Sequence, residues 1–202
     1  MTLQIHTEHS AQHEQDQLAI FDRTIFGFWI YLMTDCVLFA TLFAVYAILH
    51  QNTFGGPSAQ DLFSLPFALK ETLILLFSSF TCGIAMLAAK RKHLTSVLGL
   101  LLVTFLLGAS FLGLELNEFY HLVQDGNSWQ KSAFLSSYFT LVGCHGLHIT
   151  FGLAWILVMM ILIQKRGLCL STMRRLNCFS LFWHFLDVIW VIIFTTVYLM
   201  GA

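Results

Sequence analysis

The sequence predicts an all-α membrane protein, a bundle of five transmembrane helices in one domain. Its composition is too apolar for a water-facing surface, because 57% of the 202 residues are hydrophobic and only 10% are charged. Soluble domains carry about 25% charged residues. The mean hydropathy is +0.76, and five apolar runs reach the roughly 20 residues that a helix needs to cross a membrane. Helices are the expected form, since they satisfy their own backbone hydrogen bonds in lipid.

A polar segment precedes the five predicted spans. Residues 1–23 are polar and slightly acidic and are expected to form a cytoplasmic tail, without the basic region and cleavage site of a signal peptide. Residues 24–202 are expected to form the transmembrane domain. The predicted spans within it are residues 25–49, 67–89, 94–122, 134–163 and 176–200.

The basic residues predict the orientation of these spans. If the spans alternate in direction, eight of the ten Lys and Arg residues fall on one side, and Lys70 and Lys131 fall on the other. Cytoplasmic loops carry the excess of basic residues. We therefore expect a cytoplasmic N-terminus and a periplasmic C-terminus. The formal net charge of −1 and the lack of a basic patch give no indication of nucleic-acid binding.

Ionisable side chains within the spans are the candidate functional residues, because such groups are costly in lipid and usually face a partner or a cavity. At a rise of about 1.5 Å per residue, most of them are expected near one mid-membrane depth, with Glu115 and Glu118 closer to the outer surface. This layer is either a proton-handling or ligand site, or a polar network that holds the helices together. The candidates are Asp35, Glu115, Glu118, His145, His148, His184 and Asp187.

A metal site is the main chemical alternative. Glu118 and His121 match half of the paired E-x-x-H pattern of helical di-iron proteins, and His145 and His148 lie on one helix face. The spans contain no second E-x-x-H, and the five cysteines stand singly. We expect no metal, cofactor or catalytic residue on this chain. A self-contained membrane di-iron oxidase built on these residues and Glu115 remains as an alternative.

Four stretches resemble subunit III of the haem–copper respiratory oxidases. They are F-G-F-W-I-Y-L-M-T-D-C-V-L-F at residues 26–39, G-L-E-L-N-E-F-Y-H at 113–121, G-C-H-G-L-H-I-T at 143–150, and L-F-W-H-F-L-D-V-I-W-V-I-I-F at 181–194. The likeness covers residues 25–201. In the number of predicted helices and in the amino-acid sequence of the first and last stretches, the chain resembles subunit III of the cytochrome o-type ubiquinol oxidases. The aa-type enzymes that oxidise menaquinol or cytochrome c are a close alternative.

This resemblance implies a proton-pumping complex of the bacterial inner membrane that oxidises ubiquinol and reduces oxygen to water. It implies haem and copper in subunit I, and subunits I, II and IV as partners. The chain itself is then expected to stabilise subunit I, bind phospholipid and support proton uptake. Asp35 stands where many relatives have a carbodiimide-reactive glutamate, and Glu118 matches a family glutamate. The seven candidates are then expected to be lipid contacts or a buried polar network.

Overall fold

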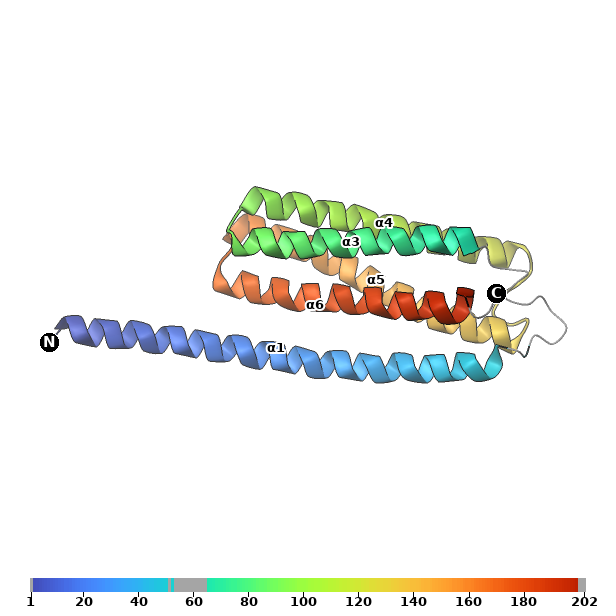
Figure 1. Ribbon diagram of the computed structural model, residues 1–202, viewed down its shortest axis with the longest axis horizontal. Helices are drawn as coiled ribbons and strands as arrows, with labels where there is room; N and C mark the ends of the chain where they lie inside the picture. The colour runs from blue at the N-terminus through green and yellow to red at the C-terminus, as the bar shows by residue number, and fades with distance from the viewer. Residues whose placement is uncertain (1, 51, 53–64, 200–202) are drawn as a thin grey trace.

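The computed structural model describes residues 2–50, 52 and 65–199 and arranges them as a bundle of long helices (Figure 1). The helices are α1 (Thr2–Leu49), α3 (Leu65–Lys90), α4 (Leu94–Gln124), α5 (Ala133–Arg166), α6 (Leu170–Ile193) and the π-helical continuation η1 (Phe194–Leu199). Five stretches of these helices are long and apolar enough to cross a membrane. The predicted all-α bundle of five spans is therefore confirmed in the described part of the chain.

Two helices begin earlier than hydropathy indicates. α1 starts at Thr2, so the backbone of the segment expected as a polar tail is helical, and its apolar span begins only at Asp22. In Figure 1 this N-terminal part of α1 extends beyond the rest of the bundle. α6 starts at Leu170 rather than at residue 176. Polar side chains lower hydropathy without interrupting a helix, so the spans mark the membrane-crossing part only. Residue 200, the predicted end, lies outside the described residues.

Local sequence signals set the ends of α5 and the turn before α4. The Ser132 hydroxyl accepts a hydrogen bond from the Leu135 backbone N–H at 3.2 Å and caps the first turn of α5. Gly167 follows α5 with φ +67°, a conformation that favours glycine after a helix. A tight turn at residues 91–93 joins α3 to α4, with Lys92 at φ +58°. Short connections of this kind make sequence neighbours antiparallel.

The core lies where α3, α4, α5 and α6 meet, and α1 packs against α5 and α6. Trp183 of α6 is buried at its centre and donates from Nε1 to the Ser78 hydroxyl of α3 at 3.2 Å. Gly108 and Gly152 leave room for its ring, because a Cβ at either would be 2.8 Å from a ring carbon. Trp190 donates in the same way to Thr72. Two tryptophans of α6 therefore fix its register against α3.

Candidate functional site: ionisable side chains inside the bundle

The structure divides the predicted polar layer into separate sites, and the first of them joins α1 to α5. Asp35 is buried, and its Oδ2 lies 3.6 Å from Nε2 of His148. His148 donates from Nδ1 to the Cys144 carbonyl at 2.7 Å, so its Nε2 is an acceptor when the ring is neutral. A hydrogen bond between them therefore needs either a protonated imidazole or a protonated carboxyl. Tyr31, one turn before Asp35, also lies within electrostatic range of this carboxyl.

The second site lies between α3 and α6. The Ser79 hydroxyl and Nδ1 of His184 are 2.6 Å apart, and Asp187 lies within electrostatic range of that imidazole. Asp187 Oδ1 is buried and has no hydrogen-bond partner among the described residues. An open groove of about 540 Å³ runs along this pair, lined by Leu76, Ser79, Phe80, Gly83, Ile84, Leu87, His184 and Asp187.

The third site is a group of carboxyl groups nearer the end of the bundle at which α3 begins and α4 ends. Glu71 is fully buried and Glu115 is 3% exposed, and the described residues offer neither of them a hydrogen-bond partner. Glu118 accepts from the Tyr198 hydroxyl at 3.4 Å, and that hydroxyl is 3.1 Å from Tyr138. All three carboxyl groups lie within electrostatic range of one another. Several ionised carboxylates here would be energetically costly, because a charge inside the membrane needs an opposite charge or a hydrogen-bond donor beside it.

His145 belongs to none of these pairs. Its ring is completely buried, stacks on Trp190 with a centroid separation of 5.3 Å, and meets Phe39 and Phe111 edge-on. Neither ring nitrogen has a hydrogen-bond partner among the residues that the structure describes. His145 therefore acts as an aromatic core residue, while His148, one turn further along, faces α1.

Glu71 is the ionisable (Asp, Glu or His) side chain of these sites that the sequence-based set of candidates lacks. It follows Lys70 at the start of an apolar run, a place where charged residues usually reach the membrane surface. The structure separates the neighbours, because Lys70 is exposed and Glu71 points into the core. A helical projection that places Glu71 on the same face as Leu75 and Ser78 would have been the available signal.

The residues of the di-iron alternative are not brought together. His148 faces Asp35, His145 is enclosed by aromatic rings, and His121 is exposed. Among the described residues, no three His, Cys, Asp or Glu side chains form a group that could hold a metal ion. The described residues thus form polar pairs between helices, a cluster of three carboxyl groups and a groove between α3 and α6. They form no set of metal ligands.

Comparison with known proteins identifies the family. Residues 4–202 match the family described as cytochrome c oxidase subunit III. The chain is 55% identical to a Pseudomonas aeruginosa protein named cytochrome bo(3) ubiquinol oxidase subunit 3, over 96% of this chain and 91% of the relative. It is 48% identical to quinol oxidase subunit 3 of Bacillus subtilis, over 88% of this chain and 87% of that protein.

A further relative is cytochrome c oxidase subunit 3 of Bacillus sp. (strain PS3), which is 49% identical over 87% of this chain and 84% of that protein. The family match extends over nearly all of the described helices and includes each of the four stretches that resemble the oxidase subunits. The chain belongs to the cytochrome c oxidase subunit III family.

Proposed function

We propose that this chain is the non-catalytic subunit 3 of a proton-pumping ubiquinol oxidase in the bacterial inner membrane. The main support is the 55% identity, over 96% of the chain, to a protein named as that subunit. In such a complex ubiquinol is oxidised and oxygen is reduced to water. Haem and copper belong to subunit I, and subunits I, II and IV are the partners of this chain.

The second candidate differs in the electron donor. Relatives named quinol oxidase subunit 3 and cytochrome c oxidase subunit 3 are 48% and 49% identical to this chain. They support an aa-type complex that oxidises menaquinol or cytochrome c. The ubiquinol assignment is preferred because the identity to the bo(3)-type relative is higher and extends over more of the chain.

The groove between α3 and α6 supports a role in holding a neighbouring membrane subunit, for which we propose subunit I. The span of α6 and η1 has 30 residues, or about 45 Å, and His184 lies about 21 Å from its start. Lipid head groups do not reach this depth. Asp187, which is half-buried at this groove, is therefore matched best by a donor on another helix. Ser79 and Gly83, which line the groove one turn apart, allow a helix to approach closely.

A separate apolar groove on α5 supports phospholipid binding. It has a volume of about 320 Å³ and is lined by Phe151, Ala154, Trp155 and Val158. The described residues that line it are apolar or aromatic and none is charged, so an acyl chain fits it better than a charged group does. Lipid at this surface would cover exposed aromatic side chains of the bundle, and the subunit would support proton uptake by keeping subunit I intact.

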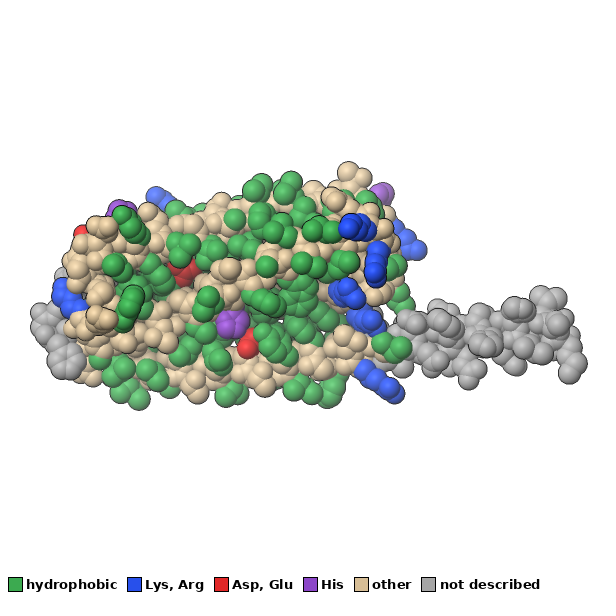
Figure 2. Space-filling view, turned by 180° about the vertical axis from the view of Figure 1, so that it is seen from behind, with side chains coloured by type: hydrophobic (Ala, Val, Ile, Leu, Met, Phe, Trp, Pro, Cys, Tyr) green, Lys and Arg blue, Asp and Glu red, His purple; other side chains and the backbone are tan. Residues whose placement is uncertain are grey.

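The charge distribution supports the proposed orientation. Figure 2 shows most of the Lys and Arg side chains visible on this face at one end of the bundle, and fewer at the other end. Lys90 ends α3 there and is followed by Arg91 and Lys92. Lys165 and Arg166 end α5, and Arg174 and Arg175 lie in the first turns of α6. This end faces the cytoplasm under the positive-inside rule.

The accessory role is tested by replacing Asp35 in the assembled complex. Asp35→Ala removes the α1 partner of His148 but no redox group, so the initial rate of oxygen consumption should match that of the unmodified complex. Activity should then decay faster during turnover, and Asp35→Glu, which keeps a carboxyl group, should restore the lifetime. Complete loss of oxygen reduction in a correctly assembled Asp35→Ala complex would contradict the non-catalytic assignment.

A further inference from the structure

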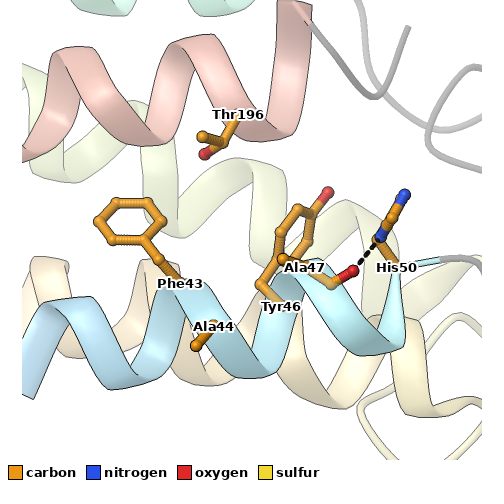
Figure 3. Close-up of a pocket in the computed structure, with 6 residues that line it drawn as sticks. All are labelled: Phe43, Ala44, Tyr46, Ala47, His50 and Thr196. Carbon is orange, nitrogen blue, oxygen red and sulfur yellow. Dashed lines mark hydrogen bonds between the residues drawn. The ribbon is translucent and has the colours of Figure 1, made fainter.

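A half-open pocket of about 410 Å³ lies between the end of α1 and η1 (Figure 3). It is lined by Phe43, Ala44, Tyr46, Ala47, His50 and Thr196. In Figure 3 the rings of Tyr46 and His50 point from α1 toward the helix that carries Thr196. α1 ends at Leu49, so the polar part of the pocket lies at the edge of the span, while Phe43 and Ala44 continue toward the bilayer centre. Its volume is in the range of small-molecule sites.

Tyr46 offers an unused polar group to this pocket. The residue is 4% exposed, and its hydroxyl has no hydrogen-bond partner among the described residues. The ring is held in place, since it stacks on His50 with centroids 6.1 Å apart and packs against Phe134 at 6.3 Å. Buried tyrosine hydroxyl groups usually find a partner. A ligand with a polar group at this point would supply it.

The remaining polar atoms of the pocket are acceptors. Nδ1 of His50 is 2.8 Å from the Ala47 carbonyl, which can only accept, so Nδ1 carries the proton and Nε2 of the neutral ring is an acceptor. The Thr196 hydroxyl already donates to the Ile192 carbonyl at 2.9 Å, which leaves its oxygen as an acceptor. Among the described residues that line the pocket, none is charged. These residues therefore present one free donor, on Tyr46, and two acceptors.

We infer that this pocket binds the head group of a reduced quinol, with the ring beside Phe43 and Tyr46. A quinol hydroxyl can accept from Tyr46 and at the same time donate to His50 or Thr196. The apolar tail then leaves along Phe43 and Ala44 into the bilayer. This inference rests on the proposed function, in which quinol is the substrate of the complex. The site holds substrate beside the neighbouring subunit and performs no electron transfer.

The donor and acceptor pattern distinguishes the quinol from two competing ligands. An oxidised quinone has only carbonyl acceptors, so it can use Tyr46 but leaves the two acceptors of the pocket without donors. A lipid phosphate is an anion that favours Arg, Lys or several donors, and this pocket supplies a single neutral hydroxyl. The loss of one or two hydrogen bonds corresponds to about tenfold weaker binding of the quinone than of the quinol.

Photolabelling of the purified oxidase complex tests the site. The probe is an azido analogue of ubiquinol, kept reduced under argon in the presence of cyanide, and labelled peptides are identified by mass spectrometry. We expect label on the peptide that contains residues 43–50. Unlabelled ubiquinol should suppress this labelling at about one-tenth of the concentration at which ubiquinone suppresses it. Tyr46→Phe and Thr196→Val should each reduce the amount of label on this peptide by a factor of up to about ten, with the complex still assembled.

Tyr120→Phe is the matched control, because Tyr120 is an exposed tyrosine near the same end of the bundle and does not line the pocket. Its label should equal that of the unmodified complex. The inference is overturned if this chain carries no label, if Tyr46→Phe leaves the label unchanged, or if phospholipid protects as well as ubiquinol. Oxygen consumption with ubiquinol is measured in the same preparation. An active complex without label refutes the pocket alone, whereas a complex that cannot use ubiquinol refutes the proposed function.

Discussion

At the scale of single residues, the tightest constraint in the bundle is the contact of glycines with Trp183. A Cβ at residue 152 would be 2.8 Å from Cζ3 of this ring, and the ring cannot move freely because its Nε1 donates to Ser78. Close approach of helices through glycine is typical of membrane bundles. Here the small residue leaves space for a large ring rather than for a backbone.

Gly152→Ala should therefore destabilise the bundle by about 1–3 kcal/mol, as expected for an overpacked core. The change is measured as a lower unfolding temperature of the purified complex in detergent. Gly113→Ala is the control, because a Cβ at that residue would meet nothing within 4 Å. Equal stability of the two variants would show that the Trp183 contact is not tight.

Cys169, in the connection between α5 and α6, is expected to be an unusually reactive thiol. The Thr172 hydroxyl lies 3.1 Å from its sulfur, and this hydrogen bond lowers the pKa of the exposed Cys169 thiol. A lowered pKa places more thiolate at neutral pH, and thiolate is the reactive form. Maleimide labelling of Cys169 should then begin at a lower pH than that of an ordinary thiol. Thr172→Val should shift the pH profile upward, and an unchanged profile would contradict this explanation.

At the scale of helices, depth along each span was predictable from the sequence, but direction around the helix axis was not. Asp35 and His148 meet across α1 and α5, whereas His184 meets Ser79 across α6 and α3. Residues at similar depth therefore belong to different faces of the bundle. Helical rise gives the position of each residue along its helix. Only the packing of the helices decides which of these residues are in contact.

The groove between α3 and α6 gives a prediction at this scale. Asp187→Leu removes the half-buried carboxyl group that lines the groove of the proposed partner helix. Because hydrogen bonds between transmembrane helices contribute about 0.6–1.7 kcal/mol, recovery of subunit I with this chain should fall about three- to twentyfold. Val188→Leu, at an exposed neighbouring residue of α6, should leave recovery unchanged. Full recovery with Asp187→Leu would contradict the proposed helix contact at this groove.

At the scale of the whole molecule, hydropathy and charge were enough to predict five spans in one all-α bundle. They could not predict that Glu71 is buried beside Glu115, because Lys70 next to it marks a membrane edge. Nor could they predict that α1 continues to Thr2. Hydropathy reports the energy of transfer into lipid, and it is silent about helix formation outside the membrane and about contacts between distant segments.

The orientation of the whole bundle can be tested through Cys169. This exposed thiol lies among the basic residues between α5 and α6, the end proposed to face the cytoplasm. A membrane-impermeant maleimide should therefore label it in inverted membrane vesicles but not in intact spheroplasts. A Cys169→Ser variant identifies the background from the other cysteines. Labelling of Cys169 from the periplasmic side would reverse the proposed orientation.

The central claim is that this chain serves the chemistry of a neighbouring subunit in a ubiquinol oxidase. The most direct measurement is ubiquinol-driven oxygen consumption by the complex isolated in mild detergent through a tag on this chain. We expect a haem-containing catalytic subunit to co-purify, oxygen to be consumed with ubiquinol and not with reduced cytochrome c, and the separated chain to be inactive. A chain that purifies alone, contains iron and consumes oxygen by itself would contradict the account.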